Sequence, residues 1–376
     1  MAKDPDNLQR FASGAGDGVI KVWDLTSREE TWNVQGHEGI VKGLCWTKDQ
    51  KIISCASDKS IKVFDPYRTS SGSAPIATYL GQTAFTGVSH HRSTSSFAAS
   101  SNVISIYDLS RSSAIATETL KWSTSDATIN ALAFNPSETS IIASCATDRS
   151  IMLFDLRTQE PLPDRPILRL ASNAIAWNPM EPMNLAVANE DHNIYHFDTR
   201  HMKRATNVQK DHVAAVMDIE FSPTGEELVS ASYDRTVRLW DRAAGHSRDI
   251  YHTKRMQRVF SAQFTPDSQY LLSGSDDGNI RLWRAHASQR EGIKSARQRQ
   301  SMEYNDTLKK RYGHMPEIKR IQRHRHVPKQ IKKAGEIKAE ELAAIKRRVE
   351  NERKHSKKGQ IPRRSEREKM VLATEE

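Results

Sequence analysis

Hydrophobic and polar residues alternate in short runs over the first three quarters of the chain, and turn-forming residues separate these runs. The clearest copy contains Val216–Phe221, then Ser-Pro and Thr-Gly turns, then Glu227–Ser232 and Val237–Asp241. Alternation over five or six residues predicts β-strands with one buried face, and proline is tolerated where a strand ends. After residue 284 the alternation stops, and Lys, Arg, Glu, Gln and Ala, which favour helices, become frequent. The pattern therefore predicts a β-region followed by a helical one.

The β-region is a repeat array. In six copies an aspartate is followed six residues later by an aromatic residue, and a seventh copy has Ser101 before Tyr107. Successive aromatics lie 41, 43, 47, 43, 43 and 43 residues apart. A period in the low forties built from short strands predicts a β-propeller in which each repeat forms one four-stranded blade. We therefore predict an all-β, seven-bladed propeller over residues 11–284. The six pairs are Asp17/Trp23, Asp58/Phe64, Asp148/Phe154, Asp191/Phe197, Asp234/Trp240 and Asp277/Trp283.

The two ends of the array are expected to be incomplete. The first copy begins at about Phe11 with its second strand, and residues 1–10 are predicted to be disordered. The segment that would supply the outer strand of the last blade is also missing from the pattern, so the chain is expected to be an N-terminally shortened form. Because an open sheet edge lacks half of its hydrogen bonds, the junction of blades one and seven is predicted to be the least stable part of the ring.

These repeats resemble the WD-repeat family over roughly residues 11–284. In that family a histidine before the first strand, a Ser or Thr in the second, the turn aspartate and the tryptophan form a buried hydrogen-bonded tetrad. By position, copy six has all four. A buried carboxylate needs several donors, so we expect this blade to be the most rigid. The residues expected to form the structural tetrad are His212, Ser232, Asp234 and Trp240.

The Ser, His and Asp of this set could also suggest a hydrolase. They follow the repeat period, however, and the chain has no G-x-S-x-G motif, so we predict no catalytic residue, no enzymatic activity, no small-molecule substrate and no cofactor. His314, His324 and His326 lie among Lys and Arg residues that repel cations, so no metal site is predicted. No run of about 18 apolar residues indicates a membrane span.

Positive charge is concentrated in the last quarter of the chain. The net charge is +10, but residues 285–376 contain 26 Lys and Arg against 13 Asp and Glu, a net +13, so residues 1–284 carry −3. This asymmetry favours a polyanionic partner such as RNA, bound mainly through its phosphates, while a merely solvated helix face remains the alternative. We predict a basic helical domain over 285–354, with helices over 288–311, 316–326 and 329–354 and a break at Gly335, then a flexible basic tail over 355–376. Candidate RNA-binding residues are Lys309, Lys310, Arg311, Lys319, Arg320, Arg323, Arg325, Lys329, Lys332, Lys333, Lys346, Arg347 and Arg348.

The tract KKRYGHMPEIKRIQRHRH at residues 309–326, directly after a seven-copy WD array, is similar to that of the Sof (suppressor of fibrillarin) family of WD proteins. This resemblance covers nearly the whole chain. It implies a scaffold in the nucleus and nucleolus, within the small-subunit processome, that acts in ribosome biogenesis and rRNA processing. The implied partners are pre-ribosomal RNA, the box C/D guide RNP and other processome proteins. Three unpaired cysteines are consistent with such a reducing compartment.

A second resemblance concerns the ends of copies four and five, Phe154-Asp-Leu-Arg and Phe197-Asp-Thr-Arg. Consecutive Asp-x-Arg endings look like those of WD proteins that serve as substrate receptors of cullin-4 RING ubiquitin ligases. The candidate contacts with the ligase adaptor are Asp155, Arg157, Asp198 and Arg200. Local pairing of each arginine with its own aspartate is an equal alternative at this stage, because the motif is short.

Overall fold

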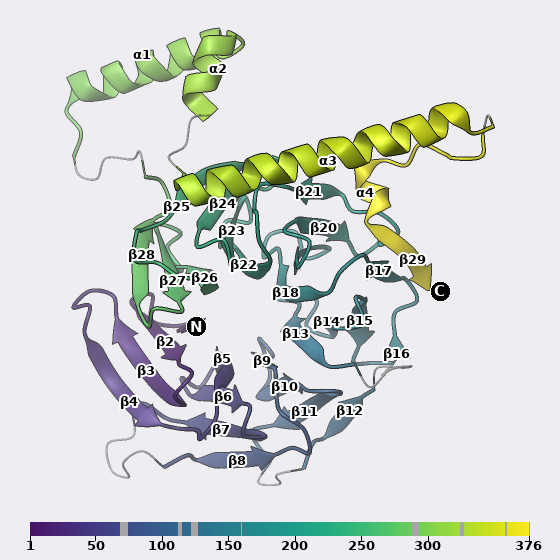
Figure 1. Cartoon of the computed structure of the whole chain (residues 1–376). Coiled ribbons are helices and arrows are strands. Elements are labelled where there is room, and N and C mark those ends of the chain that lie inside the picture. Colours follow the sequence, from purple (N-terminus) through teal and green to yellow (C-terminus); the bar gives the residue numbers. More distant parts are fainter. Residues whose placement is uncertain are drawn as a thin grey trace.

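The computed structural model describes residues 1–67, 74–111, 115–121, 127–158, 160–287, 293–323, 327–357 and 359–375. Within these residues, seven antiparallel sheets surround a central axis and form a β-propeller (Figure 1). Six of the sheets have four strands and the last has three. Strands that are neighbours in sequence are neighbours in each sheet, so each repeat folds as one blade. The predicted fold class, a seven-bladed propeller with a helical C-terminal extension, is confirmed.

The strands of the ring follow the predicted alternation, and the repeat aromatics Phe64, Phe154, Phe197 and Trp240 are buried between blades. The first three blades comprise β1 (Ala2–Lys3), β2 (Arg10–Gly14), β3 (Val19–Asp24), β4 (Glu30–Gln35), β5 (Val41–Trp46), β6 (Ile52–Ala56), β7 (Ser60–Phe64), β8 (Ala77–Leu80), β9 (Gly87–His90), β10 (Ser96–Ser100), β11 (Ile104–Asp108) and β12 (Glu118–Leu120). The next two blades comprise β13 (Ile129–Phe134), β14 (Ile141–Ala146), β15 (Ile151–Asp155), β16 (Glu160–Pro161), β18 (Ser172–Trp177), β19 (Asn184–Asn189), β20 (Ile194–Asp198) and β21 (Asn207–Gln209). The last two comprise β22 (Val216–Phe221), β23 (Glu227–Ser232), β24 (Val237–Asp241), β25 (Ser247–Tyr251), β26 (Val259–Phe264), β27 (Tyr270–Ser275) and β28 (Ile280–Arg284).

The first ten residues are folded, which differs from the predicted disordered segment. The short strand β1 pairs with β2 and occupies the inner position of blade one, which the sequence pattern left empty. The carbonyl of Met1 accepts a hydrogen bond from Gln263 Nε2 at 2.8 Å, and Lys3 Nζ pairs with Glu220 Oε1 at 2.6 Å. These contacts connect blade one to blades seven and six. A two-residue strand is too short to show alternation, so the sequence could not reveal it.

Blade seven agrees with the expectation of an incomplete last blade. It is the three-stranded sheet β26-β27-β28, and in the described part of the chain no fourth strand pairs with β28. The side chain of Leu282 in β28 is 38% exposed, whereas the matching Leu239 of blade six is fully buried. Blade seven is therefore less well covered on its outer side than blade six.

The helical region differs in detail from the prediction. The first helix begins at residue 296 because Ser295 caps it: the Ser295 hydroxyl accepts from Gln298 N, and the Gln298 side chain accepts from the Ser295 amide. The predicted start at 288 lies outside the described residues. The third helix continues through Gly335 without the predicted break. The bounds are α1 (Ala296–Tyr312), α2 (Pro316–Arg323), α3 (Lys329–His355) and α4 (Glu366–Lys369).

α3 lies across blades five and six, whereas α1 and α2 project away from the ring (Figure 1). A Cβ atom on Gly335 would lie 3.9 Å from Val213 Cγ2, an ordinary contact distance, so the helix faces the ring at this glycine. One turn later, Lys338 Nζ donates to the carbonyl of His212 at 2.8 Å. This hydrogen bond helps to hold α3 on the ring, because a helix with so few apolar residues cannot form a core of its own.

The last residues are also placed differently from the predicted flexible tail. α4 contacts blade five, where Arg367 O accepts from Ala205 N, and Glu366 pairs with Lys210. The chain then forms β29 (Val371–Glu375), which pairs antiparallel with β17 (Arg165–Leu168) at the edge of blade four. The pairing partner lies some 200 residues away in sequence, so local composition, which is polar and basic, gave no sign of it.

The strand order defines two faces of the ring. Turns between the second and third strands, and connections between blades, lie on one side, which carries the repeat aspartates and α3. We call it the aspartate face. Turns between first and second strands and between third and fourth strands lie on the other side, here called the opposite face. A side chain is thus assigned to a face by its position in the repeat.

Candidate interaction surfaces

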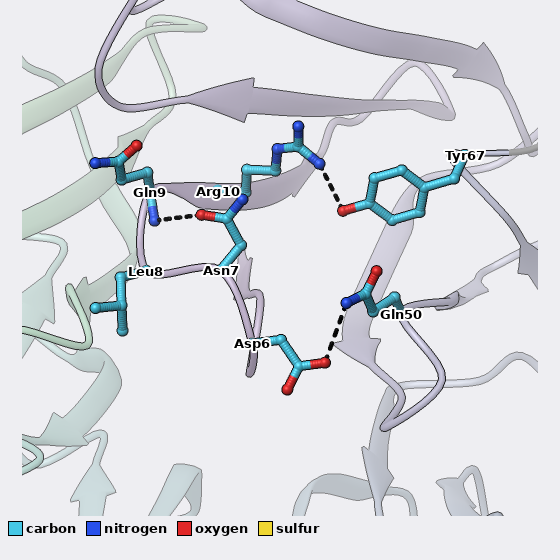
Figure 2. A pocket seen from close by; sticks show the side chains of 7 residues that line it. All are labelled: Asp6, Asn7, Leu8, Gln9, Arg10, Gln50 and Tyr67. Atoms are coloured by element: carbon cyan, nitrogen blue, oxygen red, sulfur yellow. Dashed lines mark hydrogen bonds between the residues drawn. The ribbon is translucent and has the colours of Figure 1, made fainter.

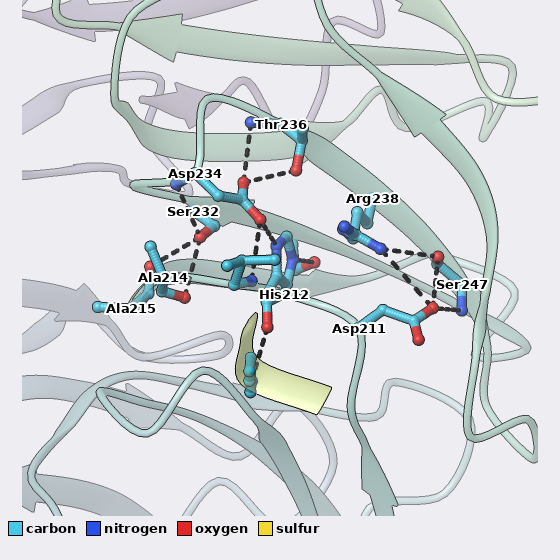
Figure 3. A network of polar contacts seen from close by, with 12 residues as sticks. Asp211, His212, Ala214, Ala215, Ser232, Asp234, Thr236, Arg238 and Ser247 are labelled. Carbon is cyan, nitrogen blue, oxygen red and sulfur yellow. Dashed lines mark hydrogen bonds and ion pairs between the residues drawn. The ribbon is translucent and has the colours of Figure 1, made fainter. Parts of the chain in front are cut away.

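Blade six contains a buried polar network that includes three of the four predicted tetrad residues, and Figure 3 shows its His212 and Asp234 side chains. His212 Nδ1 lies 2.8 Å from Asp234 Oδ2, and His212 Nε2 lies 2.6 Å from Ser230 Oγ. Trp240 Nε1 donates to the same Ser230 hydroxyl at 2.8 Å. All four side chains are almost completely buried. The network therefore connects the segment before the first strand of the blade with the second strand, the turn after it and the third strand.

The serine of this network is Ser230, and the prediction of Ser232 was wrong. Trp240 pairs with Leu228 across the sheet, so Ser230 is its diagonal neighbour while Ser232 is four residues away along β23. Ser232 Oγ instead donates to the carbonyls of Ala214 and Ala215 and accepts from Asp234 N at 3.2 Å. It closes the turn rather than reaching the ring of His212.

The same two-residue shift applies to other blades. In blade two, His37 Nε2 lies 2.7 Å from Ser54 Oγ, and His37 Nδ1 lies 2.8 Å from Asp58 Oδ2. In blade one, Trp23 Nε1 donates to Ser13, and in blade seven Trp283 Nε1 donates to Ser273, each at 2.8 Å. The hydroxyl thus recurs at the diagonal position, which the register of the strands determines.

Blade four uses a different donor, which the sequence did not suggest. Arg165 Nη2 donates to Asp148 Oδ2 at 2.6 Å and to Ser150 Oγ at 3.2 Å, so a guanidinium contacts the turn aspartate where blades two and six have an imidazole. Arg165 belongs to β17, after the aspartate in sequence, whereas the histidines precede theirs. A search for a histidine before the first strand could not find it.

The hydrogen bonds fix the protonation of the blade-six network. Burial lowers the pKa of His212, and the Asp234 carboxylate offsets only part of this effect. A neutral imidazole with its proton on Nδ1 donates to Asp234 and accepts the Ser230 proton at Nε2, which leaves the serine oxygen to accept from Trp240. Burial alone would raise the pKa of Asp234, but the His212 ring and the Thr236 donors lower it overall. Every polar group then has a partner, which describes a structural network rather than an activated nucleophile.

The two Asp-x-Arg endings lie on the opposite face of adjacent blades. Arg157 donates through Nε and Nη2 to Asp155, at 3.1 and 2.8 Å, and Arg200 does the same to Asp198, at 3.0 and 2.7 Å. The arginine side chains are nevertheless 72% and 68% exposed. The local pair therefore exists, and it holds each guanidinium in one orientation while its Nη1 group stays able to bind a partner.

The basic candidates lie on all three long helices. Lys309, Lys310 and Arg311 form the last turn of α1, and Lys319 and Arg320 lie on α2. Arg323 ends α2, its side chain outside the described part, and residues 324–326, with Arg325, His324 and His326, are also outside it. All the other candidates are exposed, namely Lys309, Lys310, Arg311, Lys319, Arg320, Lys329, Lys332, Lys333, Lys346, Arg347 and Arg348.

A shallow hollow of about 480 Å³ opens on the opposite face between blades one and two (Figure 2). Arg10 Nη1 donates to the Tyr67 hydroxyl at 2.7 Å, and Asp6 accepts from Gln50 Nε2 at 3.2 Å. These polar groups of the hollow are thus hydrogen-bonded to one another, and we assign no ligand to the hollow. Among the described residues, no group of His, Cys, Asp and Glu side chains could hold a metal ion, and no helix is long and apolar enough to cross a membrane.

Comparison with known proteins agrees with this architecture. The WD domain, G-beta repeat, matches residues 28–65, 117–155, 204–241 and 246–284, and the Sof1-like domain matches residues 285–371. The protein SOF1 of Saccharomyces cerevisiae is 45% identical over 399 positions, which cover 100% of this chain and 80% of that protein. The DDB1- and CUL4-associated factor 13 is similar too: the Xenopus tropicalis protein is 42% identical (100% of this chain, 84% of that protein) and the Dictyostelium discoideum protein 44% identical (93% and 79%).

The Sof1-like match begins one residue after β28 and ends at the first residue of β29, so it spans the helices and the connection back to the ring. The propeller, the basic helices and these similarities over the whole chain together show that this chain belongs to the Sof1-like family of WD-repeat proteins.

Proposed function

We propose that this chain is a non-enzymatic scaffold of the nucleolar small-subunit processome, in which the propeller binds proteins and the basic helices bind pre-ribosomal RNA and the box C/D guide RNP. The observation that supports this most directly is the distribution of charge: the excess positive charge lies on exposed helix surfaces outside a ring whose buried polar sets are structural. Membership of the Sof1-like family is consistent with it.

The chemistry of α1 and α2 supports contact with phosphates. Lys309, Lys310 and Arg311 are exposed in the last turn of α1, and the only acid paired with them among the described residues is Asp306, at 3.5 Å from Lys309. Cations that are not neutralised within the protein can displace counterions from RNA, and each such contact adds to the salt dependence of binding. Contacts of this kind are largely independent of base sequence.

The direct test replaces Lys309, Lys310 and Arg311 with Gln and measures binding of a transcript of the small-subunit rRNA precursor. The proposal predicts weaker binding and a salt dependence of log K reduced by about 2, from about 0.7 per lost single-strand contact. The matched control is Lys42, Lys48 and Lys59 to Gln, three exposed lysines of blade two with the same change of charge. Equal effects of both triples would refute a specific role for the helices.

The cellular role needs its own test. Depletion of the protein should leave small-subunit rRNA precursors unprocessed, and the triple Gln variant of α1 should rescue less well than the control triple. Normal precursor processing after depletion would refute the biogenesis role, whatever the binding in vitro. Localisation to the nucleolus is part of the same proposal and can be followed with a fluorescent fusion.

We also propose a second candidate function, as the substrate receptor of a cullin-4 ligase, because the two Asp-x-Arg pairs have the same bidentate geometry on adjacent blades. A rigidly held, exposed guanidinium is suited to an acidic group on an adaptor. Arg157→Ala with Arg200→Ala should abolish adaptor binding. The control is Arg111→Ala in blade three, which is 64% exposed and pairs with Asp108 at 3.8 Å but is not part of an Asp-x-Arg ending. Unchanged adaptor binding in the double variant would count against this function.

A further inference from the structure

An exposed aromatic pair lies on the aspartate face between blades six and seven. Tyr233 follows β23 in the turn before Asp234, and Phe260 is the second residue of β26. Their rings meet edge to face, with centroids 5.7 Å apart and an angle of 88°. The two residues are 37% and 44% exposed, whereas the repeat aromatics Phe197 and Trp240 are buried between blades.

The surroundings of the pair are mainly basic. The guanidinium of Arg258 lies over the Tyr233 ring, 5.4 Å from its centroid. Arg235 in the same turn and Arg255 before β26 are exposed. Two acidic residues are close: Asp234 in the same turn is buried, and Asp276, whose amide donates to the carbonyl of Arg258, is exposed. Cations therefore outnumber acids around two exposed π-surfaces, which is the composition of a stacking site for a negatively charged ligand.

The pair is also continuous with the footprint of the basic helix α3. Tyr233 N donates to the carbonyl of Ala215 at 3.1 Å. Two residues earlier, Val213 is the residue that Gly335 of α3 approaches. Lys332 and Lys333, in the turn of α3 before Gly335, are exposed. A chain of phosphates that follows α3 toward its N-terminal end would thus reach the rim of the ring beside Tyr233.

We propose that Tyr233 and Phe260 stack an unpaired base of single-stranded RNA, with Arg258 contacting the adjacent phosphate. This inference rests on the proposed RNA-binding function and adds to it a site on the propeller and a preference for single strands. The aromatic faces favour RNA over an acidic peptide, because every nucleobase has a π-face to stack whereas acidic side chains have none. Duplex RNA cannot use the site, since its bases are already stacked and paired.

The test uses the full chain and a fluorescein-labelled RNA of mixed sequence and about 20 nucleotides, longer than a single binding site, alone or annealed to its complement. Anisotropy titrations compare the wild type with Tyr233→Leu/Phe260→Leu, which keeps apolar bulk but removes the π-faces. The matched control is Tyr67→Leu, because Tyr67 is 43% exposed and lies under Arg10 at 5.3 Å, but on the opposite face. The α1 triple Gln variant serves as the reference for loss of phosphate contacts.

We expect the double Leu variant to bind single-stranded RNA about 5- to 100-fold more weakly, with duplex binding and the salt dependence unchanged. Tyr67→Leu should have no effect. Unchanged single-strand binding by the double variant, or an equal loss for both RNAs, would overturn the stacking site but leave the proposed function in place. Binding of polyglutamate that depends on the pair, with RNA binding independent of it, would identify a peptide site and also overturn it. Failure of the wild type to bind either RNA would refute the proposed function itself.

Discussion

Replacement of Ser230 by alanine tests the structure of the blade-six network most sharply. The change removes one oxygen atom that serves two partners, the Nε1–H of Trp240 at 2.8 Å and Nε2 of His212 at 2.6 Å. Both partners are buried, at 0% and 1% exposure, so water cannot take the place of the hydroxyl. The backbone of β23 is unaffected, because serine and alanine both fit a strand.

The expected loss of stability follows from these two orphaned groups. A buried polar group without a partner costs about 1–3 kcal/mol, so the two orphaned groups of Ser230→Ala should lower the free energy of unfolding by about 2–6 kcal/mol. Ser232→Ala is the matched control, two residues away in the same strand. It removes the bonds to Ala214 O and Ala215 O and also the acceptor of Asp234 N. Ala215 O keeps the Tyr233 amide as donor, and Ser232 has no bond to the His212 or Trp240 ring, so the expected loss is smaller, about 1–3 kcal/mol.

Urea denaturation followed by circular dichroism measures both variants near neutral pH. We expect a clearly lower midpoint for Ser230→Ala than for Ser232→Ala, with similar slopes, which would place the difference in the folded state. If Ser232→Ala lowered the midpoint clearly more than Ser230→Ala, the diagonal assignment of the tetrad serine would be wrong. If neither variant changed the midpoint, the network would not stabilise the blade at all.

Three further predictions concern other parts of the molecule. Burial lowers the pKa of His196 to about 4 in the folded protein, whereas in the unfolded chain this imidazole binds a proton below about pH 6.5. The free energy of unfolding should therefore fall as the pH drops from 6.5 toward 4, by about 2 kcal/mol at pH 5. His196→Gln should make the urea midpoint less dependent on pH over this range. Gly335→Ala should raise the thermal midpoint, by about 0.5–1 kcal/mol of stability, because the helix gains propensity and the new methyl group meets Val213 at an ordinary 3.9 Å; a lower midpoint would show that α3 approaches the ring more closely than this. Hydrogen exchange should be faster for amides of β28 than for those of β24, since β24 pairs with a fourth strand; equal protection would mean that another segment covers blade seven.

The sequence could predict what depends on short-range periodicity. Alternation over five or six residues and a period near 43 were sufficient to place the blades, because each blade is built from neighbours in sequence. The end of α1 at Gly313 and the start of α2 at Pro316 also followed from local signals. The helical region was predicted correctly as helical, but Gly335 was misread as a break, since a single glycine inside a helix is tolerated at a cost of about 1 kcal/mol.

The contacts that the sequence did not show all depend on register or on distant pairing. Ser230 and Ser232 are two residues apart in β23 and so lie on the same face of the sheet. Only the cross-strand pairing of Trp240 with Leu228 shows which of the two hydroxyls the indole reaches. The pairing of β29 with β17, and that of Lys338 with the His212 carbonyl, join segments that are more than 100 residues apart. No local pattern records such contacts, because the residues that make them are ordinary in their own neighbourhoods.

The placement of the candidate surfaces has a consequence for the two proposed functions. α3 and the Tyr233/Phe260 pair lie on the aspartate face, whereas Arg157 and Arg200 follow third strands and lie on the opposite face. The thickness of the ring separates them, so an RNA held along α3 leaves the Asp-x-Arg pairs accessible. The C-terminal segment is attached to the ring at α3 and again at β29, which keeps α3 beside blades five and six. The two functions therefore need not exclude each other sterically: an adaptor bound through Arg157 and Arg200 should leave the affinity for single-stranded RNA unchanged, and a loss of RNA binding in the presence of adaptor would mean that the two faces are coupled through the ring.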